Sequence, residues 1–351
     1  RIQEILDLME EARLDYFLIS DPQSIAYCTG YYNDPHERMF VFMISKHGNH
    51  TLFMNDLFYL EHDLDVNIVW HKDGQDAIQT IVDEMHFPGR IGIDKNWASH
   101  FLLDLMKKLP DAKYINASPC VDLVRMKKDL QEQVLMIESS KINDAVMEEI
   151  IPFIQEGVTE KQLAKKLDEL FFNHHSTCYG AIVAFGKNAA DPHHENDDTP
   201  LRKGDCVLID MGCVYKGYCS DMTRTFFYEG ILEEEIKVYE IVKKANEAAE
   251  AMIKPGVKLS DIDKCARKVI SDEGYGKYFT HRLGHFIGRD VHEYGDVSSV
   301  NEMEVEEGMI FSIEPGIYLE GNFGVRVEDL VMVTKDRCQV LNSFTKDIYI
   351  I

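Results

Sequence analysis

The amino-acid sequence predicts two domains, a smaller α/β domain at the N-terminus and a larger α+β domain after it. The chain has 351 residues, more than twice the usual size of about 150 residues for one domain. Short β-rich runs alternate with helical patterns in the first third, whereas helices and strands follow no regular alternation in the rest. We place the boundary so that residues 1–125 form the first domain and residues 126–351 the second.

The first domain is predicted from the order of its elements. A helical pattern covers residues 76–85, between runs rich in β-branched and aromatic residues. This order is typical of a compact α/β domain. The runs expected to form strands are residues 16–20, 39–45, 51–54, 67–70, 90–93 and 114–117.

The second domain begins with a predicted connecting helix over residues 121–154. Pro152 is expected to interrupt this helix near its end, because proline cannot donate the backbone hydrogen bond. Thr159 and Gln162 have the spacing of a capping box and predict the start of the next helix. One helical stripe of the connecting helix carries Leu135, Ile142, Val146 and Ile150.

The remaining elements of the second domain read as hairpins and helices. Residues 204–210 and 218–227 look like two strands joined by a short polar connection, and residues 309–318 and 324–334 are also strand-like. A helix over residues 232–252 stops before Pro255 and Gly256, and a second helix starts with Ser260 as its N-cap.

The composition excludes several classes of function. Lys and Arg number 37 and Asp and Glu 61, so the net charge is −24, and neither nucleic acid nor a membrane surface is an expected partner. No apolar run approaches the roughly 18 residues of a membrane span, and no signal-peptide pattern is present. The eight cysteines include no Cys-x-x-Cys pair, which predicts reduced thiols in a cytoplasmic protein.

Four acidic residues interrupt the most apolar stretches of the second domain: Asp210, Asp221, Glu314 and Glu328. Acidic side chains are depleted in strands and costly to bury. Taken singly, each has an ordinary structural explanation. Asp210 could stand in a turn at the end of a strand, and Asp221 could pair with Arg224. Glu314 could cap a helix or a turn, and Glu328 could be the partner of Arg326.

Taken together, the four carboxylates predict a metal site. Asp210 and Asp221 are 11 residues apart across the predicted hairpin, and Glu314 and Glu328 are 14 residues apart, so each pair can share one face. Buried carboxylates this close repel one another unless some are protonated or cations neutralise them. Two divalent ions would balance the four charges. Oxygen ligands with one nitrogen suit manganese, cobalt, iron or zinc.

Several histidines are candidates for the nitrogen ligand. His281 and His285 flank a glycine, and His292 follows seven residues after His285. His193 and His194 follow a loop rich in glycine and alanine, where a side chain can face a cleft. A single histidine is more often a satisfied polar or core residue than a ligand, so their local context carries the argument.

In order and spacing, these motifs resemble those of the pita-bread metallopeptidases, specifically the Xaa-Pro dipeptidase (prolidase) and aminopeptidase P group. The resemblance covers residues 136–351 through motifs, while residues 1–125 resemble the creatinase-type N-terminal domain of that group in layout. The motifs are Asp210-Met-Gly, Gly217-Tyr-x-Ser-Asp-Met-Thr-Arg-Thr225, His281-x-x-Gly-His285-x-Ile-Gly, Val291-His-Glu, Ser312-Ile-Glu-Pro-Gly and Gly324-Val-Arg-Val-Glu-Asp329.

The resemblance implies a pita-bread catalytic domain with two divalent metal ions per subunit. Manganese is the expected metal, with cobalt, zinc or iron as alternatives. Asp221 and Glu328 would bridge the two ions. The implied ligands are Asp210, Asp221, His285, Glu314 and Glu328, and all five are present.

The resemblance also implies the reaction, which is hydrolysis of the Xaa-Pro bond of dipeptides by a metal-bridging hydroxide. Glu314 would shuttle the proton to the leaving amine, and His193 and His292 would act in catalysis and bind the substrate at the scissile bond. Arg326 is the expected substrate-binding arginine, with Arg282 and Arg289 as alternatives for the terminal carboxylate.

Some alternatives remain open. Aminopeptidase P would remove the N-terminal residue from longer peptides, and a silent peptide-binding protein would keep the fold without activity. The one departure from the family pattern is Phe286, where many members have glycine after the ligand histidine, and a ring there could narrow the cleft. The family also implies a homodimer, with a small peptide as substrate.

Overall fold

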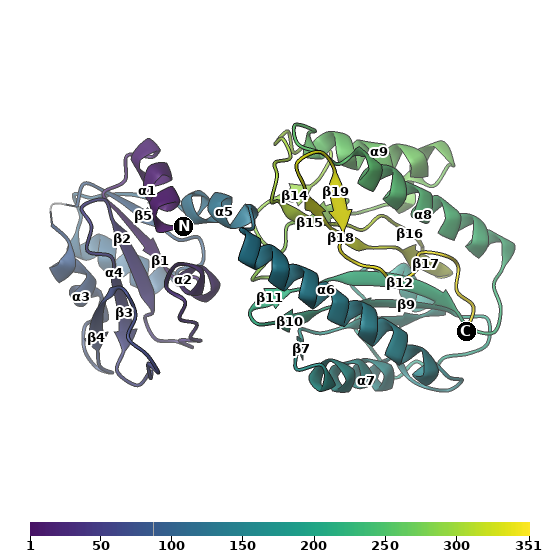
Figure 1. The fold of residues 1–351 in the computed structure, drawn as a ribbon. Helices are drawn as coiled ribbons and strands as arrows, with labels where there is room; N and C mark the ends of the chain where they lie inside the picture. Colours follow the sequence, from purple (N-terminus) through teal and green to yellow (C-terminus); the bar gives the residue numbers. More distant parts are fainter. Residues whose placement is uncertain (87) are drawn as a thin grey trace. The chain divides into compact units, whose positions relative to one another are not determined.

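The computed structural model describes residues 1–86 and 88–351, and every count below refers to these residues. The chain divides into two compact units, Arg1–Arg125 and Met126–Ile351, each described by itself (Figure 1). Within the described residues, no helix is long and apolar enough to cross a membrane.

The first unit is a six-stranded sheet with helices around it. The strand order is β4-β3-β2-β1-β5-β6, with antiparallel pairs between β1, β2 and β3 and parallel pairs elsewhere. All six predicted strands are present. Its elements are α1 (Ile2–Glu11), β1 (Tyr16–Ile19), α2 (Pro22–Thr29), β2 (Val41–Ser45), β3 (Thr51–Asn55), β4 (Asn67–His71), α3 (Ala77–Glu84), β5 (Arg90–Ile93), α4 (Ser99–Lys108) and β6 (Lys113–Asn116).

The central strand β1 is apolar throughout because both faces of this sheet are covered. Phe17 and Ile19 belong to the core on one face, and Tyr16 and Leu18 belong to the core on the other. A strand buried on both faces reads as a continuous apolar run. The helix predicted over residues 76–85 is α3, and the Asp76 side chain caps it by accepting from the backbone N–H of Gln79.

The second unit combines small antiparallel sheets with four long helices. Helix α5 (Pro119–Met126) leads into it. Its helices are α6 (Leu130–Ile150), α7 (Glu160–Asn173), α8 (Glu233–Met252) and α9 (Leu259–Asp272), with short 3-10 turns at Ile151–Phe153, Gly186–Ala190 and Gly276–Tyr278. Its strands are β7 (Thr177–Cys178), β8 (Ile182–Phe185), β9 (Cys206–Met211), β10 (Cys213–Tyr215), β11 (Tyr218–Cys219), β12 (Met222–Phe227), β13 (Gly284–His285), β14 (Asp296–Val297), β15 (Ile310–Ile313), β16 (Gly316–Leu319), β17 (Phe323–Arg326), β18 (Asp329–Val333) and β19 (Cys338–Val340).

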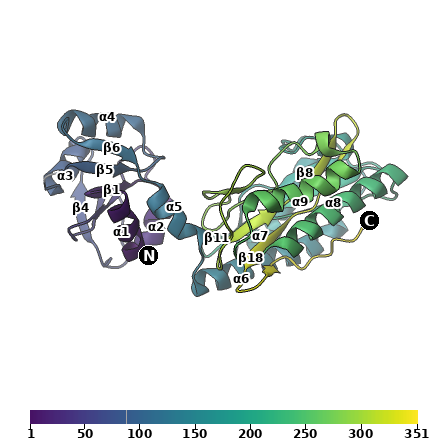
Figure 2. The ribbon, with the colours of Figure 1, turned by 90° about the horizontal axis from the view of Figure 1, so that it is seen from above.

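The helices of the second unit form two pairs around the strands. In Figure 1, α7 lies below β9 and β12, α6 crosses the view diagonally, and α8 and α9 lie above β16 and β17. Figure 2 shows α8 and α9 running side by side. The three-stranded sheets have the orders β12-β9-β8, β15-β18-β19 and β11-β10-β7. This is the mixed α+β arrangement that the sequence predicts, and the strands are enclosed between the helices.

Two predictions about helices in this unit are wrong. The expected connecting helix over residues 121–154 is two helices, because Lys127 forms an isolated β-bridge with Met309 and Asp129 caps the new helix α6. Pro152 does end it, since α6 stops at Ile150 and gives way to a 3-10 turn. Helix α9 begins at Leu259, one residue before the predicted N-cap Ser260.

The strand-like runs near the C-terminus are each broken in the middle. The run over residues 309–318 separates into β15 and β16 at Glu314 and Pro315, and the run over residues 324–334 separates into β17 and β18 at Val327 and Glu328. The two glutamates therefore occupy breaks, where a side chain can leave the apolar layer.

Candidate metal centre

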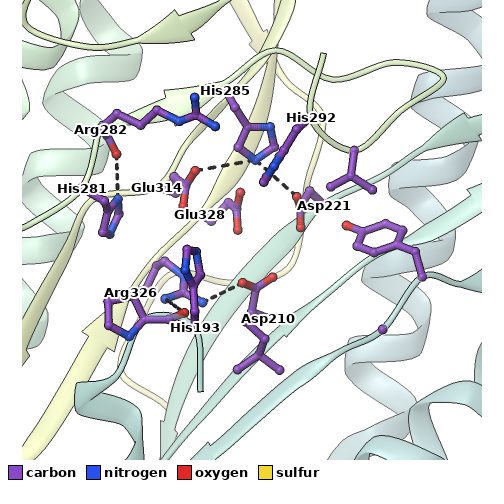
Figure 3. Close-up of a pocket in the computed structure, with 15 residues that line it drawn as sticks. His193, Asp210, Asp221, His281, Arg282, His285, His292, Glu314, Arg326 and Glu328 are labelled. Carbon is purple, nitrogen blue, oxygen red and sulfur yellow. Dashed lines mark hydrogen bonds and ion pairs between the residues drawn. The ribbon is translucent and has the colours of Figure 1, made fainter. Parts of the chain in front are cut away.

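A pocket of about 410 Å³ opens between the strands of the second unit (Figure 3). It collects side chains from parts of the chain that are far apart in sequence. The residues that line it are Tyr179, Gly180, Ile182, Pro192, His193, Asp210, Asp221, His281, Arg282, His285, Val291, His292, Glu314, Arg326 and Glu328.

The hairpin places Asp210 and Asp221 on one face, as the sequence predicts. Strand β9 pairs with β12 so that Asp210 lies opposite Thr223. Asp221 is two residues before Thr223, and residues two apart in an extended segment point to the same face. The connection between them is longer than a simple turn, because β10 and β11 form a second hairpin within it.

The antiparallel pairing of β15 with β18 brings Glu314 and Glu328 together in the same way. The last pair of β15 with β18 is Ile313 opposite Asp329. One step further in this register sets Glu314 opposite Glu328, just beyond the ends of both strands. All four predicted carboxylates therefore reach one pocket.

Three of the pocket side chains could hold one cation. One ligand atom each from Asp221, His285 and Glu328 lies within 4.8 Å of the others, and all three residues are buried. The Nε2 atom of His285 is 3.6 Å from Asp221 Oδ2 and 3.6 Å from Glu314 Oε1. Among the described residues, the buried Asp221 Oδ1 has no hydrogen-bond partner. An oxygen left without a donor in this position fits a metal ligand, as does the donor set.

Burial makes the negative charge in this pocket costly. Loss of hydration is the largest cause that raises the pKa of Asp221 and Glu328 well above their usual range, and the neighbouring carboxylates add to it. The pKa of Glu314 is raised to about 7, mainly by burial, although Arg326 opposes the shift. A cation bound here would relieve this cost.

Three imidazoles of the pocket, those of His281, His285 and His292, are neutral at physiological pH. Burial, assisted by His292, lowers the pKa of His285 to about 3, and burial lowers that of His281 to about 4. The pKa of His292 is lowered too, by burial and then by Arg282. A neutral imidazole is the form that binds metal. The rings of His292 and His285 meet edge to face with centroids 4.1 Å apart.

Adjacent histidines in the loop after β8 point in different directions. His193 lines the pocket. His194 instead donates from Nε2 to Oε2 of Glu160, 2.6 Å away, and Glu160 is fully buried at the start of α7. His281, which opens the glycine motif, lines the pocket and makes a 2.8 Å hydrogen bond between its Nε2 and the hydroxyl of Tyr318.

Arg326 lines the pocket, but protein groups occupy its guanidinium. Its Nη2 donates to Asp210 Oδ2 at 2.6 Å, its Nη1 to the hydroxyl of Tyr318 at 3.0 Å, and its Nε to Thr223 Oγ1 at 3.1 Å. Thr223 in turn donates to Glu328 Oε2 at 2.7 Å. Arg326 thus orients two carboxylates of the pocket, one directly and one through a hydroxyl.

The simple ion-pair explanations for two of the carboxylates are wrong. Arg224 pairs with Asp329, not with Asp221, at 2.7 Å. Arg326 pairs with Asp210 and reaches Glu328 only through Thr223. Since neither ion pair is found, a shared metal site is the better explanation for the acidic residues.

Phe286 does not narrow the cleft. Its ring is fully buried and packs against Phe311 with centroids 5.3 Å apart, and it is absent from the residues that line the pocket. The expected effect on the cleft is therefore not found, and the sequence feature that favoured a silent protein has a structural role.

Several residues that orient the site were not predicted. Ser312 accepts from the backbone N–H of His285 at 3.0 Å and donates to Glu314 at 3.2 Å. Tyr179 lines the pocket and donates to the backbone oxygen of Ser220 at 2.7 Å. A Cβ at Gly212 would lie 1.9 Å from the Tyr179 hydroxyl, so this ring position requires glycine there. Gly212 belongs to a motif that is recognisable in the sequence, but nothing in the sequence identifies Tyr179 as the residue that packs against it.

Comparisons with known proteins agree with this geometry. The family model described as "Metallopeptidase family M24" matches residues 134–335, and the one described as "Creatinase/Prolidase N-terminal domain" matches residues 1–127. An uncharacterized peptidase of Staphylococcus aureus is 34% identical over 99% of both chains. The crystal structure of a dipeptidase from Pyrococcus horikoshii is 34% identical with a TM-score of 0.93, covering 100% of this chain and 99% of that one. A prolidase from Thermococcus sibiricus is 32% identical with a TM-score of 0.94, covering 100% and 98%.

Proposed function

Because the chain belongs to metallopeptidase family M24, we propose that it is a dipeptidase that hydrolyses the bond between an N-terminal residue and proline. The pocket is the observation that supports this most directly, since four carboxylates and a neutral imidazole converge on it. The substrate class is supported by similarity to a dipeptidase and a prolidase over their whole lengths.

The proposed ligands of two divalent ions are Asp210, Asp221, His285, Glu314 and Glu328. Two ions bound there would supply Lewis-acid activation of a substrate carbonyl and a water molecule of lowered pKa. Manganese is the proposed metal, and the oxygen-rich ligand set also suits cobalt, zinc or iron. Residues 126–351 would carry this chemistry, with residues 1–125 as a separate non-catalytic domain.

Glu314 is the proposed proton shuttle. Its carboxylate lines the pocket beside the other proposed ligands, within reach of a bound substrate, and the Ser312 hydroxyl donates a hydrogen bond to one of its oxygens. His193 and His292 are proposed to donate hydrogen bonds to the substrate carbonyl as negative charge develops on its oxygen. Both line the pocket from connecting segments and not from strands.

The size and lining of the pocket favour a short substrate with proline second. About 410 Å³ is near the lower end of the range of about 300–1,000 Å³ for small-molecule sites. Tyr179, Ile182, Pro192 and Val291 provide apolar surface for a pyrrolidine ring. A bond to proline has no N–H, so the substrate must be held by its shape and its ends.

Arg282 is the proposed partner for the carboxylate of a dipeptide. The guanidinium of Arg326 is already bonded to Asp210, Tyr318 and Thr223, which supports a role for Arg326 in orienting the ligands. Arg282 lines the pocket with a side chain that is 40% exposed, and its nearest acidic partner, Asp296, is 4.0 Å away.

We further propose a cytoplasmic homodimer. All eight cysteines are free thiols, which suits a reducing compartment. Large apolar side chains exposed on the first unit, among them Tyr32, Leu57 and Tyr59, suit a protein interface. The molar mass in solution tests the dimer.

The function is tested by comparing a dipeptide that ends in proline with a tripeptide that has proline second. Metal-stripped protein is assayed with and without added manganese, cobalt or zinc, and bound metal is measured in parallel. We expect metal-dependent cleavage of the dipeptide alone. Preference for the tripeptide would indicate an aminopeptidase P activity, and no cleavage with two metals bound would refute the proposed substrate.

A further inference from the structure

Two neighbouring lysines at the beginning of the second unit make ion pairs of different kinds. Lys128 Nζ lies 2.9 Å from Oε2 of Glu293, and their side chains are only 1% and 5% exposed. Lys127 pairs with Glu306, but those side chains are 47% and 56% exposed. An exposed pair contributes little, whereas breaking a buried pair leaves a charge without hydration. The buried pair therefore has a specific structural task.

Glu293 braces the loop that carries His292. Its Oε1 accepts from the backbone N–H of Arg289 at 2.9 Å, and its own N–H donates to the carbonyl of Phe286 at 2.9 Å. A Cβ at Gly288 would lie 2.7 Å from Glu293 Oε1, so the carboxylate fills the inside of this loop. The loop conformation at residues 286–293 depends on this carboxylate.

Lys128 approaches the loop from a fixed base. Its backbone N–H donates to the carbonyl of Gly308 at 2.8 Å, and its carbonyl accepts from Gln133 Nε2 at 2.7 Å. The next residue, Asp129, caps α6 by accepting from two backbone N–H groups in the first turn of the helix. The ammonium group is thus held at the N-terminal end of a long helix.

The ring of His292 lies at the end of this arrangement. It contacts the ring of His285 edge to face, 4.1 Å between centroids. His285 is anchored independently, since β13 pairs with β14 and Ser312 accepts from its N–H. His292 has no regular strand around it, so the loop backbone sets its position.

We infer that Lys128 is a positioning residue for the reaction, acting through Glu293 on the loop that places His292. The inference rests on the proposed function, because it assigns His292 a part in catalysis. Lys128 is not among the residues lining the pocket and touches no proposed metal ligand. Its removal should therefore change turnover without emptying the metal site.

The test compares Lys128→Met with the matched control Lys127→Met on the metal-loaded enzyme. For Lys128→Met we expect kcat to fall at least tenfold, KM to change less than threefold, and bound metal to stay at the wild-type value. Lys127→Met should match the wild type in all three. Lys128→Arg keeps the ion pair and should retain at least half of the wild-type kcat.

A double-variant cycle separates positioning of His292 from general damage. In a His292→Ala background, Lys128→Met should lower kcat less than twofold further, because the residue it positions is gone. An equal fall in both backgrounds would refute the inference. A wild-type kcat for Lys128→Met beside an impaired His292→Ala would refute it too and leave the proposed function intact. A fully active His292→Ala would instead refute the role of His292, and the inference with it.

A readout without activity covers the case of an inactive or unstable variant. Hydrogen exchange of metal-free protein should be faster over residues 286–293 in Lys128→Met, and unchanged there in Lys127→Met. Should Lys128→Met not fold, Glu293→Gln removes the charge with little change in shape and should show the same loop-specific increase. Unchanged exchange in this loop would overturn the inference.

Discussion

Replacing Glu314 by glutamine should make the metal-free protein less sensitive to rising pH. Burial is the main reason that the pKa of Glu314 is raised from 4.5 to about 7. Since the folded-state pKa lies above the unfolded value, this group favours folding fully below about pH 4.5, and that contribution is lost as the pH rises through about 7. Glutamine cannot ionise, so in the variant this side chain causes no loss of stability as the pH rises.

The size of the effect follows from the shift. A rise of about 2.5 pKa units corresponds to about 3 kcal/mol, at about 1.4 kcal/mol per unit. The side chain is only 17% exposed, so water screens little of this cost. For a domain of 150–250 residues, about 3 kcal/mol corresponds to a shift of about 6–12 °C in Tm.

The assay is thermal unfolding of metal-stripped wild type and Glu314→Gln at pH 4.5, 6 and 8. The difference in Tm between them should move by about 6–12 °C in favour of the variant from pH 4.5 to pH 8. Adding manganese at pH 8 should stabilise the wild type more than the variant. Parallel pH profiles for the two proteins would refute the account of the buried charge.

Further predictions concern single groups around the site. Glu314→Gln should lower kcat at least about 100-fold in the metal-loaded enzyme, because a group that moves a proton is removed, and retained activity would end its role as the shuttle. Gly212→Ala should cost about 1–3 kcal/mol in a denaturant titration and reduce activity, since the new Cβ would meet the Tyr179 hydroxyl at 1.9 Å and the Ser220 carbonyl at 2.1 Å; an unchanged midpoint would contradict this packing. His194→Leu should cost about 1–3 kcal/mol because it leaves the buried Glu160 with one donor fewer, whereas His194→Gln, which keeps a donor, should be close to wild type.

Local sequence patterns predict the structural features that depend on residues close together in the sequence. The strand over residues 90–93 is found with the same bounds, because a short run with the β-branched residues Ile91 and Ile93 is enough to indicate a strand. The four carboxylates were recognisable because acidic side chains inside apolar runs need a reason, and a fixed spacing brought each pair together across antiparallel strands.

Contacts between distant segments could not be predicted in this way. Tyr179 bonds to Ser220, 41 residues away, and Lys128 to Glu293, 165 residues away. No periodicity links such partners, since only the fold brings them together. The break before α6 is different, because Asp129 and Glu132 form a capping box whose spacing is visible in the sequence. The apolar stripe over residues 135–150 favoured one continuous helix, so the helix start at the capping box was not predicted.

The division of the pocket between strands and loops affects how such a protein can diverge. Asp210 lies in β9 and His285 in β13, and the other acidic residues stand directly beside strand ends, where paired neighbours fix their backbone. The apolar side chains of Pro192 and Val291 line the pocket from connecting segments, which tolerate exchanges more readily than paired strands do. Mutations in those segments can therefore alter which peptides are accepted while the acidic framework persists, so new specificities can evolve without rebuilding the centre.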